Sequence, residues 1–150
     1  MSQQTMLKMK VGLVGCGNIG ADLCIALQRG TIPAEIVALT DIDEARARKL
    51  LNSFSLNAAI CDLDDTVAAA DFIVECAQPS VVESVVEAAI RHHRDCLIMS
   101  VGGLMDHPDL IAEAREKGVD IRIPSGAISG LDCIRAAMEA GLHHVTLTTR

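Results

Sequence analysis

Residues 10–20, with the sequence KVGLVGCGNIG, carry the strongest structural signal in the chain. The stretch starts as an apolar run typical of a buried strand and ends in residues that favour a helix. Between the two lie Gly15, Gly17 and Gly20, a spacing that lets a strand turn sharply and pass directly into a helix. The N–H groups at the start of such a helix bind anions, so the stretch predicts a phosphate-binding turn.

The remainder of the sequence alternates between short apolar runs and segments of helical length. We expect strands over residues 10–14, 35–40, 58–61, 71–76, 96–101 and 119–123. We expect helices over residues 19–29, 43–51, 63–70, 80–92, 108–117 and 129–140, with Asp106 as the N-cap of the fifth. This alternation predicts an α/β fold, a Rossmann-type doubly wound parallel sheet with strand order 3-2-1-4-5-6.

The composition limits the classes of partner. The chain has 150 residues and a net charge of -7 without a basic run, which gives no support to a nucleic-acid or membrane partner. Its six cysteines form no CxxC pair and mostly lie in apolar runs. We interpret them as small buried residues of a cytoplasmic protein, and a disulfide framework is the alternative. No apolar run approaches the ~20 residues that would span a bilayer.

An acidic residue extends the phosphate-binding turn into a dinucleotide site. Asp41 ends the second expected strand about 20 residues after Gly20, where a carboxylate accepts hydrogen bonds from the adenosine ribose. A carboxylate there repels a 2′-phosphate, so we expect NAD as cofactor, with NADP as a second option because Arg46 and Arg48 follow. The alternative is that Asp41 only caps the following helix.

Loops that follow the fourth and fifth strands are expected at the carboxyl edge of the sheet, where ligands bind in such folds. One holds Ala77 and Gln78. The other holds Gly102 and Gly103, which would leave room for a planar nicotinamide ring, and a simple turn is the alternative for this pair. Glu75 ends the fourth strand, where it either orders a water or a ribose or serves as a paired structural carboxylate.

Substrate binding and catalysis are marked less clearly. Ser125, Gly126 and Ala127 lead into an expected helix and are candidates for holding a substrate carboxylate, with ordinary helix capping as the alternative. Dehydrogenation of an amine or alcohol needs a proton acceptor, and we assign no catalytic residue in this chain. The histidines, for which we expect structural or surface roles, are His92, His93, His107, His143 and His144. No metal site is expected, because no pair has a third ligand at suitable spacing.

Five strings, in order along the chain, resemble the L-aspartate dehydrogenase family. They are VGCGNIG (14–20), DFIVECA (71–77), LIMSVGG (97–103), IPSGAISGLD (123–132) and VTLTTR (145–150). The resemblance implies NAD(P)-dependent oxidation of L-aspartate to iminoaspartate, which feeds NAD biosynthesis. It also implies dinucleotide contacts, at Asn18, Ile19, Asp41, Ala77, Gln78 and Gly103. The family usually has Ala where Gly103 stands and Ser where Gln78 stands.

The resemblance also implies that the family's catalytic histidine lies in a second domain. We expect residues 1–140 to form the NAD(P)-binding domain. Residues 141–150 alternate like a strand, and we expect them to start a catalytic or substrate domain that this chain does not contain. The expected partners are a nicotinamide dinucleotide and a small amino acid. Two alternatives stay open, a dinucleotide-binding module or sensor without turnover and a different enzyme such as a homoserine dehydrogenase-like protein.

Overall fold

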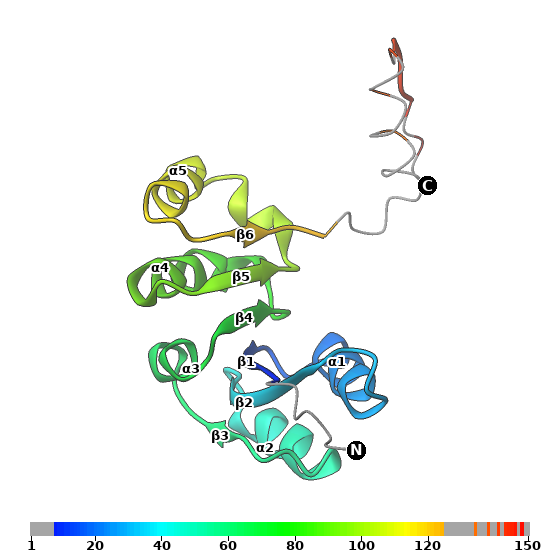
Figure 1. Ribbon diagram of the computed structural model, residues 1–150, viewed down its shortest axis with the longest axis vertical. Helices are drawn as coiled ribbons and strands as arrows, with labels where there is room; N and C mark the ends of the chain where they lie inside the picture. The colour runs from blue at the N-terminus through cyan, green and yellow to red at the C-terminus, as the bar shows by residue number, and fades with distance from the viewer. Residues whose placement is uncertain are drawn as a thin grey trace, which may run out of the picture.

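Six strands of the described chain form one parallel sheet in the order β3-β2-β1-β4-β5-β6, as the sequence predicted (Figure 1). The computed structural model describes residues 8–124, together with residues 134, 138, 141, 143–146 and 148. The strands are β1 (Met9–Val14), β2 (Ala34–Thr40), β3 (Ala59–Ile60), β4 (Phe72–Glu75), β5 (Asp95–Ile98) and β6 (Ile121–Arg122). The helices are α1 (Asn18–Gln28), α2 (Glu44–Ser53), α3 (Leu63–Ala69), α4 (Val82–His92) and α5 (Pro108–Glu116), with 3₁₀ turns η1 (Pro79–Val81) and η2 (Val101–Leu104).

β1 lies in the middle of the sheet, between β2 and β4. Its residues from Val11 onward are buried, and Leu13 is completely inaccessible to solvent. At its carboxyl end Val14 lies beside Thr40 of β2 and Glu75 of β4. The strand order reverses between β1 and β4, so the glycine turn leaves the sheet at the switch point where doubly wound folds bind their ligands.

The helices form one layer on each face of the sheet. α1 and α2 lie on one face and α3, α4 and α5 on the other, which Figure 1 shows with the sheet seen between them. Each layer has its own core. Cys24 of α1 and Leu50 of α2 pack with one cluster of buried apolar residues, while Val67 of α3 and Val85 of α4 pack with a second. Aliphatic side chains and cysteines fill both clusters, as expected for a chain with few aromatic residues.

Aspartates begin two of the helices. The Ala45 N–H donates to Asp43 Oδ1 at 3.0 Å, and the Asp65 N–H donates to Asp62 Oδ1 at 2.9 Å. Each carboxylate therefore satisfies one of the N–H groups that a helix start leaves without a partner. The fifth helix does not follow this pattern. His107 is the N-cap of α5, without a side-chain cap, so the prediction of Asp106 as N-cap was wrong and Pro108 alone marks the start.

β5 is shorter than the apolar run that predicted it. The run continues to Val101, but the strand ends at Ile98 because Ser100 turns toward a buried carboxylate and η2 begins at Val101. Of the helix expected over residues 129–140, the structure describes Ile134 and Met138, and both are helical. The candidates Ser125, Gly126 and Ala127 lie outside the described residues. The strand expected at the end of the chain is not found in its described part, residues 143–146 and 148. A strand needs a neighbour to supply its ladder hydrogen bonds, and alternation alone does not provide one.

Candidate functional site

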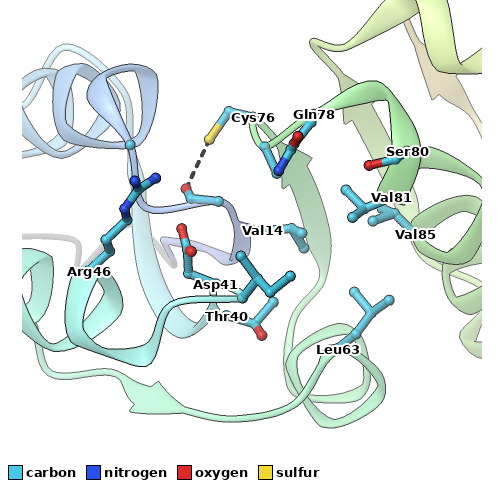
Figure 2. Close-up of a pocket in the computed structure, with 14 residues that line it drawn as sticks. Val14, Thr40, Asp41, Arg46, Leu63, Cys76, Gln78, Ser80, Val81 and Val85 are labelled. Atoms are coloured by element: carbon cyan, nitrogen blue, oxygen red, sulfur yellow. Dashed lines mark hydrogen bonds between the residues drawn. The ribbon is translucent and has the colours of Figure 1, made fainter.

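A cavity of about 250 Å³ lies at the carboxyl ends of β1, β2 and β4 (Figure 2). Asp41 and Arg46 lie on one side of it, and Ser80, Val81 and Val85 lie on the other. Pockets for small organic ligands typically measure roughly 300–1,000 Å³, so this cavity would hold only part of a dinucleotide. Its floor is the glycine turn, since Gly15 and Gly17 both line it.

The three glycines of the turn serve three different purposes. Gly15 has a φ of 98°, in the left-handed region, and a Cβ there would lie 2.7 Å from the Ala77 nitrogen. A Cβ on Gly20 would lie 2.7 Å from the Gly15 oxygen, so this glycine lets α1 approach the turn. A Cβ on Gly17 would have no atom within 4 Å, so the space above this residue is open. Gly15 and Gly20 thus let the strand turn sharply and pass directly into α1, as their spacing predicted.

α1 begins directly at the turn, whose glycines Gly15 and Gly17 line the cavity. Its N-cap is Gly17, which supplies no side-chain hydrogen bond. Asn18 and Ile19 follow in the first turn, both exposed. A helix start without a side-chain cap, next to an open glycine, has the geometry of an anion site.

Asp41 joins the end of β2 to the glycine turn. The Cys16 N–H donates to its Oδ2 at 2.7 Å and the Asp43 N–H donates to its Oδ1 at 2.9 Å. The cap of α2 is Asp43, so the alternative in which Asp41 only caps that helix is not the arrangement found. Each carboxylate oxygen has more than one lone pair, so Asp41 still has acceptor capacity on the cavity that it lines.

The two arginines considered for a 2′-phosphate differ in position. Arg46 lines the cavity beside Asp41 and lies 3.6 Å from the Asp43 carboxylate. Arg48 forms an ion pair with Glu44 along α2 and does not line the cavity. Of the two arginines, Arg46 is therefore the one that lies on the cavity with Asp41.

Cys76 is a residue whose role the sequence analysis missed. Its thiol donates to the Gly15 carbonyl oxygen at 3.1 Å, the dashed line in Figure 2, and so ties β4 to the turn. Burial, with the Glu75 carboxylate nearby, raises the pKa of this thiol to about 12. The sequence predicted a small buried residue, but a thiol–carbonyl hydrogen bond across 61 positions leaves no local pattern.

The two loops predicted to meet the nicotinamide lie side by side, but their residues are placed differently. Ala77 and Gln78 line the cavity, whereas Gly102 and Gly103 do not. A Cβ on Gly103 would lie 2.4 Å from the Pro79 oxygen, so this glycine lets η2 pack against η1. Gly102 has no atom within 4 Å of a Cβ position. The reason given for the pair, room for a planar ring, thus fits Gly102 only.

Glu75 is completely buried at the end of β4. Its Oε1 accepts from the Ala77 N–H at 2.8 Å and the Ser100 hydroxyl at 2.9 Å, and its Oε2 accepts from the Ser100 N–H at 2.9 Å. Of the two roles considered for it, the structure shows the structural one, with backbone and hydroxyl donors in place of a cation. The serine at position 100 was not singled out from the sequence.

The described residues that line the cavity include neither His nor Lys, the usual proton acceptors in such a dehydrogenation. His92 and His93 lie at the end of α4 and His107 at the start of α5, as predicted. His143 and His144 are exposed and lie outside any strand. Within the described residues no group of three His, Cys, Asp or Glu side chains could hold a metal ion. The same part of the chain has no helix long and apolar enough to cross a membrane.

The fold occurs in solved dehydrogenases. The myo-inositol dehydrogenase of Lactobacillus casei, crystallised with NAD(H) and myo-inositol, superposes with a TM-score of 0.74 at 20% identity, over 91% of this chain and 42% of that one. The WlbA dehydrogenase of Bordetella pertussis, with NADH and UDP-GlcNAcA, has a TM-score of 0.73 at 20% identity, over 90% of this chain and 43% of that one. At these identities the likeness shows the fold alone.

Curated relatives cover nearly the whole chain. The L-aspartate dehydrogenase of Methanocella arvoryzae is 38% identical over 144 residues, which are 94% of this chain and 53% of that protein. That of Bradyrhizobium diazoefficiens is 34% identical over 151 residues, 100% of this chain and 54% of that protein. The chain therefore spans about half the length of the curated relatives it matches.

The family described as "Homoserine dehydrogenase, NAD binding domain" matches residues 15–124. The match begins at the first glycine of the turn and continues just beyond β6, so it contains the whole carboxyl edge of the sheet on which the cavity opens. Since it covers more than half of the sequence, the chain belongs to this family of NAD-binding domains.

Proposed function

We propose that this chain is the NAD(H)-binding half of an oxidoreductase that acts on L-aspartate. The single observation that supports NAD(H) binding is the open glycine turn, in which Gly17 faces free space at a helix start without a side-chain cap. The substrate class is supported by relatives named L-aspartate dehydrogenase that match 94% of the chain at 38% identity and 95% at 35% identity.

The residues of the site fit an extended dinucleotide. The pyrophosphate would lie over Gly17, with the N–H groups of Asn18 and Ile19 as donors. Asp41 would accept from the adenosine ribose, and its charge favours NAD over NADP, while Arg46 beside it would partly offset that preference. At the other end of the cavity, Ala77 and Gln78 would contact the nicotinamide, with Gly102 and Gly103 in the adjacent loop.

When bound, NAD+ would supply the hydride acceptor for the oxidation of an amine to an imine, a reaction that also needs a proton acceptor. The described residues supply binding and orientation to this reaction, because none that lines the cavity is a suitable proton acceptor. We therefore place the acceptor outside the described residues. The proposed contacts of the substrate carboxylate remain Ser125, Gly126 and Ala127. The proposed location of the protein is the reducing cytoplasm, in keeping with the free thiols of the described chain.

A titration followed by NADH fluorescence tests the cofactor half of the proposal. We expect saturable NADH binding that is tighter than NADPH binding. In the Asp41→Asn variant we expect NADH to bind about tenfold more weakly, about 1.4 kcal/mol, with a smaller preference over NADPH because the repelling charge is gone. Asp62→Ala is the matched control. It removes the cap of α3, which costs about 1 kcal/mol of stability, and it should leave the ratio of the two dissociation constants unchanged, because Asp62 bonds to neither Asp41 nor Arg46.

Absence of NADH binding by the folded chain would refute the proposal. The substrate half is tested with a chimera, in which this chain replaces the matching half of the Methanocella arvoryzae relative. We expect it to form NADH from NAD+ with L-aspartate and not with L-homoserine. A chimera that binds NADH but oxidises only homoserine would support the homoserine dehydrogenase alternative, which the family description favours. Turnover by this chain alone would contradict the expectation that no residue of this chain is the proton acceptor.

A further inference from the structure

The buried carboxylate of Glu75 does not line the cavity, so direct contact with a cofactor does not explain it. Glu75 and Thr66 are the two polar residues found fully buried in the described chain. No Lys, Arg or His of that part of the chain forms an ion pair with Glu75. A buried carboxylate without a cation destabilises the folded state unless hydrogen-bond donors surround it. The residues that supply these donors therefore indicate the role of Glu75.

The three donors come from two loops that are far apart in the sequence. Ala77 belongs to the loop after β4, and Ser100 belongs to the loop after β5. The carboxylate thus bridges the loops where neighbouring strands end at the carboxyl edge of the sheet. The Ser100 carbonyl in turn accepts from the Gly103 N–H at 2.9 Å, which extends the connection into η2.

Both loops are held to the rest of the site at close range. The Ala77 nitrogen lies 2.7 Å from the position of a Cβ on Gly15, and the Pro79 oxygen lies 2.4 Å from that of a Cβ on Gly103. A displaced Ala77 or Ser100 would therefore change the spacing between the glycine turn, η1 and η2. The Asp41 side of the cavity depends on separate hydrogen bonds, to Cys16 and Asp43.

We propose that Glu75 is a positioning residue for the nicotinamide end of the cofactor site. Its carboxylate fixes the two loops that face the ring, while the adenosine end keeps its geometry through Asp41. The inference rests on the proposed function, because it requires that the dinucleotide lies across the cavity with its nicotinamide at Ala77 and Gln78.

The test compares NADH with ADP-ribose, which has the same adenosine, ribose and pyrophosphate but no nicotinamide. Glu75→Gln keeps the shape of the side chain, yet its NH₂ group faces an N–H or hydroxyl that needs an acceptor. We expect NADH affinity to fall about tenfold and ADP-ribose affinity to stay within about twofold. Ser100→Ala, which removes one of the three hydrogen bonds, should give the same pattern with a smaller loss. In the double variant the losses should not add, because both act on one contact.

Thr66→Val is the matched control, since Thr66 is equally buried but its hydroxyl donates to the Asp62 carbonyl and not to a residue of either loop. It should leave the ratio of NADH to ADP-ribose affinity unchanged. Should Glu75→Gln fail to fold, Ser100→Ala alone decides the question. Equal losses for both ligands, no loss for either, or equal binding of NADH and ADP-ribose by the unmodified chain would each overturn the inference. A chain that binds neither ligand refutes the proposed function instead.

Discussion

Gly17 and Gly20 belong to one motif, but different forces keep each of them a glycine. At Gly20 the reason is internal, because a methyl group would meet the Gly15 carbonyl and the helix would have to move away. At Gly17 the structure holds nothing within reach of a Cβ, so the fold itself makes no demand there. The open space at Gly17 belongs to the cavity, where it leaves room for the backbone to approach a ligand.

Alanine at each position separates the two reasons. Gly17→Ala should leave the free energy of unfolding within about 1 kcal/mol of the original and weaken NADH binding by tenfold or more, about 1.4 kcal/mol. Gly20→Ala should cost about 1–3 kcal/mol of stability, because a backbone oxygen 2.7 Å away cannot yield as a side chain would. Urea unfolding and NADH titration of both variants provide the measurement. A Gly17→Ala protein that binds NADH normally would show that the open space is not the cofactor's.

The positions of single residues were predictable where the local backbone conformation requires a residue type. They were not predictable where the role of a residue depends on a partner far away in the sequence. Gly15 and Gly20 follow from a local motif, and Asp41 follows from its distance along the chain. The hydrogen bond between Cys76 and Gly15 joins residues 61 positions apart, and the one between Glu75 and Ser100 joins residues 25 positions apart. No periodicity reports such pairs, because each depends on which strands become neighbours.

Between helices, the first turn of α3 and the last turn of α4 are joined by charge. Asp64 accepts from Arg91 and lies 3.1 Å from the His92 Nε2. The close approach of the His92 Nε2, together with the charges of His92 and Arg91, holds the pKa of the Asp64 carboxyl below its usual 3.8. All of these groups are exposed or half-exposed, so the link is modest and sensitive to salt.

This link predicts a specific pH dependence. A carboxyl whose pKa is lower in the folded than in the unfolded state adds stability above its unfolded pKa and loses it as the pH falls through the folded one. We therefore expect Asp64→Asn to be less stable than the original near pH 7, with the difference closing below the usual pKa of 3.8. Urea unfolding from pH 7 to pH 3 measures it. Asp65→Asn, on the same turn of α3 without such an ion pair, should show a smaller difference, and equal effects would place the cause in the helix start alone.

Whole elements were predicted from periodicity, and their errors have local causes. The apolar run after residue 95 was expected to stay a strand to Val101, but Ser100 bonds to Glu75 and the chain turns into η2. Asp106 suits an N-cap by type, yet α5 starts one residue later, at a proline that sets its own first turn. In β5 a contact with a distant residue overrode the strand propensity, and at α5 one local preference overrode another.

Across the molecule, the cysteines behave as packing residues. Cys16, Cys24, Cys76 and Cys96 are buried without disulfides, as predicted. Burial raises the pKa of the Cys24 thiol to about 11 and that of the other three thiols to about 12. At pH 8 about one such thiol in a thousand or fewer would be ionised. Cys61 is only half-buried.

Thiol labelling should follow this division. In a Cys133→Ser background, so that every remaining cysteine is one that the structure describes, we expect Cys61 to react quickly at pH 8 and the other four to wait for unfolding. Counting the thiols that react with an aromatic disulfide, before and after adding urea, measures it. Adding Cys61→Ser should remove the fast phase. Rapid reaction of two or more thiols in the folded protein would contradict the burial of the cores.

The strand order was predictable in full because parallel strands, right-handed crossovers and the glycine turn leave few arrangements open. The positions of the site residues were predictable only to the correct edge of the sheet. Whether Gly103 faces a ligand or packs on Pro79, and whether Arg46 or Arg48 turns toward Asp41, depends on rotations of a helix or loop that sequence spacing does not fix.

The central place of β1 also sets an order of events during synthesis. β1 leaves the ribosome first and pairs with β2, but its other edge pairs with residues 72–75 of β4. Until those residues emerge, that edge keeps its backbone N–H and C=O groups unpaired beside buried-type side chains such as Val11 and Leu13. The nascent chain therefore carries an open, aggregation-prone strand edge until β4 emerges and closes it, and the residues directly after β4, Cys76 and Ala77, then line the cavity.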